Sequence, residues 1–276
     1  MQNRSIRTAV ITSPDDHARA QKILAMYESL SDERKAQISQ EELQQLQEKL
    51  ALAQAIYNGE IAACLEDQSG NGYHIDVAVS NSKQSVNMVQ RGDGLALRGW
   101  FELNQEGARE RFNDIIGGSF TIEATVDLDR GTGFSYIAGK CDDCFGLRTE
   151  SNQVNFYIYN GSDWKNARVR LEESDYDRPA HVVISYADGT MTLWVNGRQA
   201  VTTDAGAIQA NDKCLALGIG EYDDGHTADY HNGHTFHSFR VYDSALTPEV
   251  LETITPEDEQ VELWYDFDKL TYLPAT

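Results

Sequence analysis

The first 58 residues carry a helical pattern of hydrophobic positions. Apolar side chains recur every three or four residues, the spacing of one helix face, at Ala20, Ile23, Tyr27 and Leu30. A second stripe with this spacing follows at Leu43, Leu46, Leu50, Ala53 and Tyr57. Each stripe is narrow, so we expect these helices to pack against each other or against the following domain.

Local residues predict where the helices begin and end. Ser13-Pro14 predicts a serine N-cap followed by proline at the first helical position. Ser39 and Glu42 have the spacing of a capping box, and Asn58-Gly59 has the composition of a helix stop. We therefore predict a helical spacer over residues 1–58.

From Gly59 onward the pattern changes to short β-rich runs separated by turn residues. Residues 119–128 alternate, with apolar residues of one face at Phe120, Ile122, Ala124 and Val126. Similar runs lie at Phe134–Ala138, Phe145–Arg148, Val154–Tyr159, Val182–Tyr186, Met191–Val195, Arg198–Thr202, Leu215–Ile219, Phe236–Tyr242 and Leu263–Phe267. Asp188-Gly189 and Asn196-Gly197 have the composition of tight hairpin turns. No long helical pattern interrupts these runs, which excludes a parallel βαβ fold and predicts an antiparallel sandwich or barrel.

The charge balance narrows the choice of partners. The chain of 276 residues contains 44 acidic and 23 basic residues, a net charge of −21. Such a surface repels phosphate groups, so nucleic acid and anionic membranes are disfavoured partners. Cations and neutral ligands such as sugars are compatible with it, and acidity that serves solubility alone is the simpler alternative.

The sequence contains no stretch that approaches the roughly 20 apolar residues needed to span a bilayer, so we expect no membrane insertion. Residues 1–11 lack the apolar run of a signal peptide. We therefore expect either a cytoplasmic protein or a module of a longer secreted protein.

Six short motifs occur in the order typical of one family. They are Asp67–Gly72 (DQSGNG), Asp93–Leu97 (DGLAL), Phe120–Ala124 (FTIEA), Ile137–Lys140 (IAGK), Met191–Gly197 (MTLWVNG) and Phe239–Thr247 (FRVYDSALT). Between Ile61 and Phe267 the chain resembles the LamG-like, concanavalin A-like jelly-roll modules appended to bacterial β-galactosidases and other secreted carbohydrate-active proteins. The resemblance implies a mainly β fold, with an antiparallel two-sheet jelly-roll sandwich over residues 59–276 and a small α-helical segment before it.

The helical segment has a shorter resemblance of its own. Tyr27–Lys35 (YESLSDERK) is similar to the helical spacers between modules of surface proteins. Together the two resemblances imply a fragment of a multi-modular bacterial protein that is secreted or held at the cell surface. Its partners would then be glycans and the other modules of the parent chain.

Catalysis by a β-sandwich glucanase needs two carboxylates on one strand that flank the anomeric carbon. The nearest pattern is Glu173-Ser174-Asp175-Tyr176-Asp177, which lies in the loop before the strand that begins at Val182. The sequence contains no G-x-S-x-G motif, H-E-x-x-H motif or phosphate-binding glycine loop. We therefore expect no catalytic residues in this chain.

The turn Asp67–Gly72 is rich in oxygen ligands of the kind that calcium prefers. In LamG-like modules this turn often helps to hold a structural calcium, which implies Asp67 and Asn71 as metal ligands here. An acid is common near the final R-I-Y strand of the family, whereas this chain has His237 in that region. The alternative is a glycine-rich turn whose aspartate satisfies its own backbone.

One candidate sugar site is aromatic. Tyr157 and Tyr159 share one face of a predicted strand, Phe156 and Ile158 share the other, and one of the two faces must be core. Trp164 follows in a polar loop. We expect Tyr159 and Trp164 to bind ligand.

The second candidate is the long loop Glu221–His237. It contains Tyr222, Asp224 and His226, whose side chains suit sugar hydroxyls and the apolar faces of sugar rings. Its histidines and acids can also bind zinc, although they lack a recognisable ligand spacing. A long solvated loop is the simplest alternative, but long loops on a sandwich often carry function.

The cysteines do not decide the redox compartment. Cys64 and Cys214 lie in apolar surroundings that suggest buried thiols. Cys141 and Cys144 flank a predicted two-residue hairpin turn, where paired positions come within reach of a disulfide. The alternative is two thiols.

We therefore expect a non-catalytic, lectin-like module that binds carbohydrate. The alternative is a structural or protein-interaction module that packs on its parent enzyme without binding sugar, because a fold does not determine function.

Overall fold

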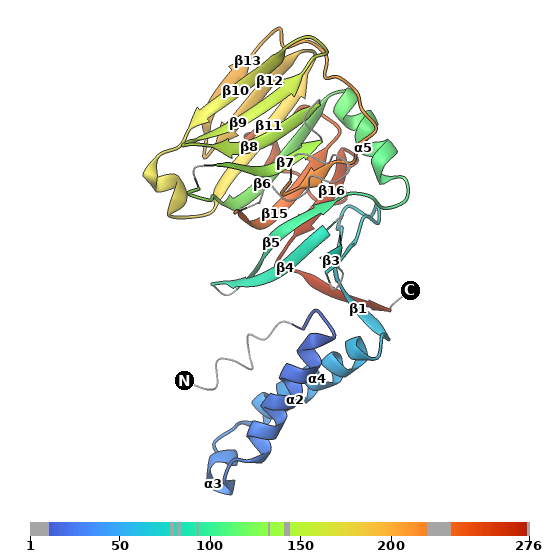
Figure 1. Cartoon of the computed structure of the whole chain (residues 1–276), viewed down its shortest axis with the longest axis vertical. Coiled ribbons are helices and arrows are strands. Elements are labelled where there is room, and N and C mark those ends of the chain that lie inside the picture. The colour runs from blue at the N-terminus through green and yellow to red at the C-terminus, as the bar shows by residue number, and fades with distance from the viewer. Residues whose placement is uncertain are drawn as a thin grey trace. The chain divides into compact units, whose positions relative to one another are not determined.

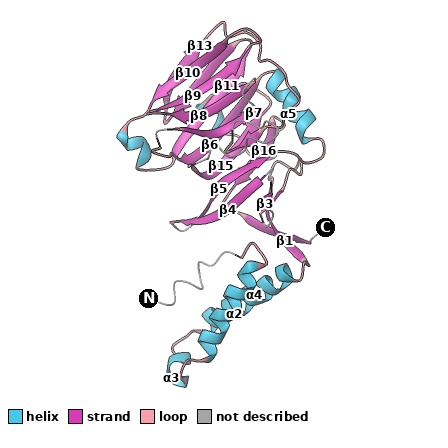
Figure 2. Cartoon of the chain, in the orientation of Figure 1, coloured by secondary structure: helices cyan, strands magenta, loops and turns pink. Residues whose placement is uncertain are grey.

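The computed structural model describes residues 11–77, 80–81, 84–92, 94–131, 133–140, 144–219 and 233–274. Contacts between residues divide the chain into two compact units. The smaller unit comprises Met1–Leu65, Ile75–Val79 and Leu270–Thr276, and the larger unit comprises Glu66–His74 and Ser80–Lys269. Figure 1 labels the elements in chain order, and Figure 2 shows that helices dominate the first part of the chain and strands the rest.

The smaller unit contains a pair of packed helices. They are α2 (Asp15–Glu28) and α4 (Gln40–Tyr57), separated by the short α3 (Asp32–Lys35). Their buried core comprises Ile11, Ala20, Ala53 and Ile56. This packing confirms the two predicted apolar stripes except at Tyr57, which is 58% exposed at the end of α4. The predicted capping box is also confirmed, because the Glu42 N–H donates to Ser39 Oγ over 3.2 Å and the Ser39 N–H donates to the Glu42 carboxylate over 2.9 Å.

The start of α2 differs from the predicted serine cap. The Ser13 side chain makes no capping hydrogen bond, and the helix begins at Asp15. Asp16 Oδ2 instead accepts hydrogen bonds from the N–H groups of Thr12 (2.9 Å) and Ser13 (3.1 Å). Asp16 therefore makes the half of a capping box in which a carboxylate reaches back to the N–H three residues earlier, while the half that the Ser13 side chain would make is missing.

A three-stranded antiparallel sheet completes the smaller unit. Its central strand is β1 (Ile61–Leu65), flanked by β2 (Ile75–Asp76) and by β17 (Leu270–Pro274). No element was predicted for the last of these, because its pairing partner lies some 200 residues earlier in the chain. The helix α4 ends one residue before the predicted boundary at residue 58, but β1, β2 and β17 group with the helices.

The larger unit is built from antiparallel strands. They are β3 (Ser80–Asn81), β4 (Gln84–Arg91), β5 (Gly94–Glu102), β6 (Phe120–Asp127), β7 (Phe134–Lys140), β8 (Phe145–Glu150), β9 (Gln153–Tyr159), β10 (Trp164–Arg170), β11 (Ala180–Ala187), β12 (Thr190–Val195), β13 (Arg198–Thr202), β14 (Ala216–Leu217), β15 (Thr235–Tyr242) and β16 (Val261–Asp266). The described strands follow the order β10-β9-β8-β7-β14-β5-β15-β6-β11-β12-β13, with β16 beside β15 and β4 beside β5. All of these pairs are antiparallel, so the predicted mainly β fold is confirmed.

This strand path folds back on itself to form two layers around one core. Phe120 on β6 contacts Phe145 on β8, with 5.8 Å between their ring centroids, although four strands separate β6 from β8 in the sheet order. The two ends of the path meet where Thr202 Oγ1 on β13 donates to the Asn166 carbonyl on β10 over 2.7 Å. The result is the antiparallel jelly-roll sandwich that the motif order implied.

Two predicted hairpin turns are present. Asp188 and Gly189 connect β11 to β12 with φ of 48° and 76°, and Asn196 and Gly197 connect β12 to β13 with φ of 49° and 80°. Positive φ at both central residues defines the type I′ turn, which asparagine, aspartate and glycine tolerate best.

One sequence expectation about the sandwich was wrong. The helix α5 (Ala108–Gly117) lies between β5 and β6, where no long helix was expected. Its buried residues are Ala108, Phe112, Ile115 and Ile116. These residues are four, three and one positions apart, which is a helical spacing. The pattern is short and lies between two segments with strand-like alternation, so it was not recognised as a helix.

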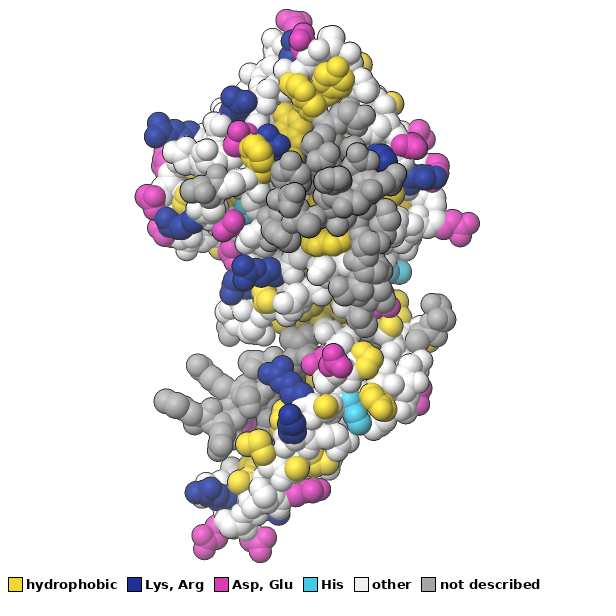
Figure 3. Space-filling view, viewed as in Figure 1, with side chains coloured by type: hydrophobic (Ala, Val, Ile, Leu, Met, Phe, Trp, Pro, Cys, Tyr) yellow, Lys and Arg dark blue, Asp and Glu magenta, His cyan; other side chains and the backbone are white. Residues whose placement is uncertain are grey.

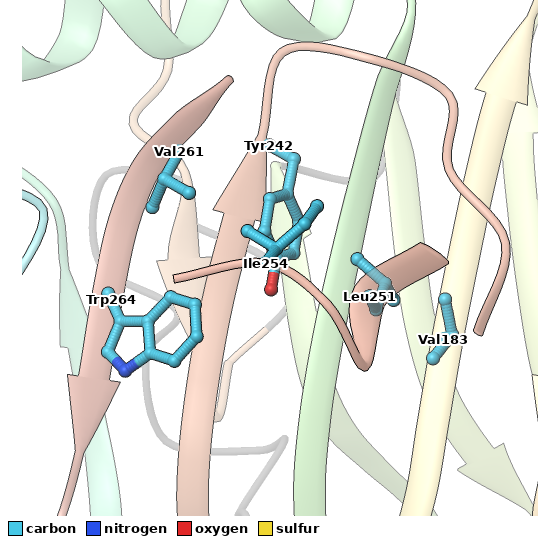
Figure 4. Close-up of a cluster of buried hydrophobic side chains, with 6 residues drawn as sticks. All are labelled: Val183, Tyr242, Leu251, Ile254, Val261 and Trp264. Carbon is cyan, nitrogen blue, oxygen red and sulfur yellow. The ribbon is translucent and has the colours of Figure 1, made fainter. Parts of the chain in front are cut away.

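A second apolar cluster covers one outer face of the sandwich. It comprises Val183, Tyr242, Leu251, Ile254, Val261 and Trp264, with Trp194 and Leu246 packed against it. Figure 4 shows Leu251, from α6 (Pro248–Leu251), and Ile254 directed at the strands that carry Val183 and Tyr242. The expectation that Trp264 is a buried packing residue is confirmed, whereas Trp194 is only partly buried and packs against the edge of this cluster.

Beside this cluster, side chains from β6, β11 and β15 surround one buried carboxylate. Glu123 accepts hydrogen bonds from His181 Nε2 (2.7 Å), Tyr242 Oη (2.8 Å) and Arg240 Nη1 (3.2 Å). Burial alone would raise the pKa of Glu123, but the hydrogen bond from His181 and the charge of Arg240 outweigh it and lower that pKa. The carboxylate thus ties three strands together without a buried unpaired charge.

Candidate functional site

The outer side of β7, β8, β9 and β10 gathers aromatic and polar side chains, and we call it the β7–β10 face. Its members are Phe134, Tyr136, Arg148, Glu150, Gln153, Asn155, Tyr157, Tyr159, Trp164, Asn166, Arg168 and Arg170. Strand register places Trp164 opposite Tyr159, Asn166 opposite Tyr157 and Arg168 opposite Asn155. The intervening Phe156 and Ile158 are fully buried, which settles which side of β9 is core.

At one end of this face three aromatic rings form a cluster. The Trp164 ring centroid lies 5.0 Å from that of Tyr159 and 5.3 Å from that of Tyr157. Trp164 is 47% exposed, whereas Tyr157 is buried. The structure therefore brings the predicted pair Tyr159 and Trp164 together, and Trp164 belongs to strand β10 rather than to a loop.

Arg148 occupies the centre of the face. Its guanidinium carbon lies over the rings of Phe134 (3.9 Å), Tyr157 (4.7 Å) and Tyr136 (5.6 Å). Its Nη1 donates to Tyr136 Oη over 2.9 Å, and its Nη2 donates to Glu150 over 3.3 Å. Cation–π contacts, a hydrogen bond and charge pairing thus hold the guanidinium among these side chains.

Asn155 lies beside Arg148 and was not predicted from the sequence. Asn155 is 2% exposed and donates to Glu150 over 3.4 Å. Asn155 Oδ1 and Arg148 Nε are both buried and have no hydrogen-bond partner in the described part of the chain. Strand register places Asn155 opposite Arg148, and both atoms lie beneath the surface of the sheet. Strict alternation along β8 and β9 is the sequence signal that could have identified both residues.

The second predicted site is only partly covered by the structure. Tyr222, Asp224 and His226 lie outside the described residues, so their role in ligand binding stays a prediction. Across the residues that the structure does describe, no three His, Cys, Asp or Glu side chains form a group that could hold a metal ion. Cys141 also lies outside the described residues, and the Cys141–Cys144 disulfide stays a prediction.

His234, near the end of that loop, is fully buried in the sandwich. Its Nδ1 accepts from the Asp129 N–H over 2.9 Å, and its Nε2 lies 3.1 Å from the Ser135 carbonyl. These contacts fit a neutral ring that carries its proton on Nε2. Burial lowers the pKa of His234 from 6.5 to about 4.

The Asp67 turn is tied to β16 by its own side chains. Asp67 Oδ1 accepts from Ser69 Oγ (2.7 Å), the Ser69 N–H (3.1 Å) and the Trp264 N–H (3.1 Å), and Oδ2 accepts from the Tyr73 N–H (3.2 Å). Asn71 Nδ2 donates to the Glu262 carbonyl over 3.1 Å. Four donors surround the Asp67 carboxylate, an arrangement that fits a self-satisfied turn better than a calcium site.

The acidic run Glu173–Asp177 does not form a pair of carboxylates on one strand. It lies in and just after the 3₁₀ helix η1 (Glu173–Tyr176). Glu173 is exposed and pairs with Arg130 at 2.6 Å. Asp175 is buried, accepts from Asn196 Nδ2 over 2.8 Å and pairs with Arg198. The run therefore anchors a loop to the turn between β12 and β13.

Comparison with known proteins identifies the class of this fold. A family model described as the concanavalin A-like lectin/glucanases superfamily matches residues 104–251. This match covers more than half of the chain, and the chain belongs to that superfamily. No curated protein shows significant sequence similarity to the chain.

Similar solved structures are distant. The Trypanosoma rangeli sialidase bound to 2,3-difluoro-KDN is 17% identical with a TM-score of 0.44, over 61% of this chain and 30% of that chain. The receptor binding domain of the botulinum neurotoxin C/D mosaic serotype is 14% identical with a TM-score of 0.45, over 70% and 50%. A botulinum neurotoxin type C structure, whose cell entry depends on two ganglioside molecules, is 13% identical with a TM-score of 0.46, over 70% and 50%. The match spans half or less of each of these proteins.

Replacement of Asp67 by alanine is expected to lower the free energy of unfolding by about 2–4 kcal/mol, because buried N–H donors lose their acceptor. Urea denaturation measures the change, and Asp268→Ala, at an exposed aspartate of the same unit, should cost less than about 0.5 kcal/mol.

If calcium binds at Asp67 and Asn71, it raises the melting temperature of the wild type but not of Asp67→Ala. An equal increase in both proteins would place the ion elsewhere.

The burial of His234 predicts a pH dependence of stability. The folded-state pKa of about 4 lies below the unfolded value near 6.5, so the unfolded chain takes up a proton first as the pH falls. This residue should therefore cost the wild type roughly 3 kcal/mol of stability between pH 6.5 and pH 4. Urea titrations of the wild type and His234→Gln across this range measure the difference, and parallel pH profiles would contradict the assignment.

Proposed function

We propose that the β7–β10 face binds carbohydrate without covalent chemistry. The observation that carries this proposal is Trp164, an indole ring 47% exposed yet braced by Tyr157 and Tyr159. A large apolar ring held rigidly at the surface loses little conformational entropy when it binds. Its position on a strand also gives it a fixed orientation.

The polar neighbours of Trp164 complement the other side of a sugar. A pyranose presents an apolar ring face to an aromatic side chain and hydroxyl groups at its rim. Asn166 and Arg168 follow Trp164 at alternate positions of β10, and the carboxylate of Glu150 is part of the same face. These amide, guanidinium and carboxylate groups are the donors and acceptors that hydroxyl groups require.

The biological setting is the second part of the proposal. The six ordered motifs and the helical unit support an ancillary module of a secreted, multi-modular bacterial glycosidase or surface protein. In that setting the parent chain supplies other modules as partners. Among the described residues no helix is long and apolar enough to cross a membrane.

A structural or protein-interaction module is the second candidate. Tryptophan, tyrosine and arginine are also the residues that dominate protein interfaces, and the β7–β10 face contains all three. This candidate would be favoured if the wild-type protein bound no sugar but did bind a neighbouring module of the parent chain.

The chain is expected to show no glycosidase activity, because Glu173 and Asp175 do not form a pair of catalytic carboxylates on one strand. The measurement is release of reducing sugar from β-glucans and of nitrophenol from aryl glycosides. Turnover by the wild type that is absent in Glu173→Gln would contradict the prediction. Equal turnover by both proteins that survives repurification would also contradict it and would place the catalytic residues outside the run Glu173–Asp177.

Replacement of Trp164 by alanine is expected to weaken binding of the best ligand from a glycan array about tenfold. Loss of the stacking surface costs roughly 1.5 kcal/mol, and 1.4 kcal/mol corresponds to a factor of ten. Isothermal titration calorimetry measures the affinity. Tyr57→Ala removes an aromatic ring that is 58% exposed in the smaller unit and serves as the control. Equal affinities of the two variants would place the sugar site elsewhere.

A further inference from the structure

The charge of the β7–β10 face is opposite in sign to that of the whole chain. The chain carries 44 acidic and 23 basic residues. The charged members of this face are Arg148, Arg168 and Arg170 against one acid, Glu150. Figure 3 shows one side of the larger unit, on which exposed hydrophobic side chains lie beside both basic and acidic side chains. The overall charge therefore does not predict the ligand of this surface.

Strand β10 orders these groups in a line. Its alternate residues Trp164, Asn166, Arg168 and Arg170 point outward, whereas Ala167 and Val169 are buried in the core. Arg168 and Arg170 are both exposed. Alternate residues of a strand are about 7 Å apart, so the two guanidinium groups continue the row that the Trp164 ring begins.

The acids near this row are already engaged. Glu150 accepts from Arg148 and Asn155. Beyond the end of β10, Glu172 pairs with Arg198 at 3.5 Å, and Glu173 pairs with Arg130.

The two outer arginines themselves lack acidic partners. Within the residues that the structure describes, neither Arg168 nor Arg170 forms an ion pair. The side-chain contact of Arg168 is a 3.4 Å hydrogen bond from its Nη2 to Asn166 Oδ1. Two exposed guanidinium groups next to an aromatic platform are therefore available to an anion.

We propose that the ligand of the β7–β10 face is an acidic oligosaccharide with carboxylate or sulfate groups repeated along its chain. This inference rests on the proposed carbohydrate-binding function. Trp164 stacks on one sugar ring, and Arg168 and Arg170 each bind an anionic group farther along the chain. The Cα atoms of Arg168 and Arg170 are about 7 Å apart along the strand, and anionic groups repeated along an oligosaccharide offer each guanidinium group a partner of its own.

The acidity of the rest of the chain does not oppose this assignment at physiological ionic strength. The Debye length there is about 8 Å, so acids farther away are largely screened. Contacts at hydrogen-bond distance retain their strength, and guanidinium groups bind carboxylates and sulfates in a bidentate manner.

Calorimetry in about 0.15 M salt tests the proposal with three probes of equal length. They are a galacturonic acid hexasaccharide, a sulfated chondroitin hexasaccharide and cellohexaose. We expect at least one acidic probe to bind about tenfold tighter than cellohexaose, the effect of one charge-assisted contact. The comparison of the two acidic probes decides between carboxylate and sulfate.

Variants assign the effect to residues. Arg170→Gln should weaken the acidic probe about tenfold and leave cellohexaose unchanged. Arg168→Gln should also weaken the acidic probe about tenfold, and should weaken cellohexaose less because only a hydrogen bond to a hydroxyl group is lost there. Trp164→Ala should weaken both classes. Arg109→Gln makes the same charge change at an exposed position of α5 and should bind like the wild type. Because both outer arginines are exposed, their variants should keep the wild-type melting temperature.

The outcomes separate this inference from the function on which it rests. If cellohexaose binds in a way that depends on Trp164, and no acidic probe binds more tightly, the proposal of an acidic ligand is wrong. The proposal of a carbohydrate site on this face then still holds. Equal losses in Arg168→Gln and Arg109→Gln overturn the assignment to β10. If the folded protein binds neither these probes nor any glycan on an array, the proposed function itself fails.

Discussion

Two layers of antiparallel strands that share one core impose the constraint from which the other features follow. Each strand must bury one side of its alternating residues, because only that side is removed from water by the opposite layer. On β9 the buried side carries Phe156 and Ile158, so Tyr157 and Tyr159 are forced outward. The aromatic and arginine-rich surface is thus a consequence of how the core is filled.

The two outer faces of the sandwich meet this constraint differently. Over β11, β15 and β16, the segment that contains α6 covers the sheet with Leu251 and Ile254. The β7–β10 face instead carries residues with an apolar body and a polar tip, together with Trp164, which stays half exposed. A covered face stabilises the fold, whereas a rigid face with exposed rings and guanidinium groups is suited to recognition.

Buried polar side chains connect segments that are distant in the chain. The Asp67 carboxylate joins its own turn to the backbone of Trp264 on β16, and Glu123 joins β6 to β11 and β15. Both are acids that would be costly to bury alone and become favourable because donors surround them. The family motifs that contain Asp67 and Arg240 therefore have a structural explanation that requires no ligand.

Local patterns determined much of the architecture before any contact was known. The period of Phe120 to Val126 predicts a strand, Ser39 with Glu42 predicts a helix start, and Asn196-Gly197 predicts a type I′ turn, since each depends on residues a few positions apart. The order of the six short family motifs along the chain was enough to indicate the concanavalin A-like class. The short helix α5 escaped this reading because its apolar residues span less than three turns.

Contacts across the sheet were decided only by the tertiary structure. The pairing of β1 with β17, the role of Asp67 as an acceptor of four hydrogen bonds, and the position of Asn155 beside Arg148 all depend on strand order and register. The same holds for the gathering of three arginines on one face of an acidic protein. Sequence periodicity states which side of a strand a residue occupies, but it does not state which residues of other strands lie beside it. Composition therefore describes the average surface of this protein, and the fold determines the chemistry of its site.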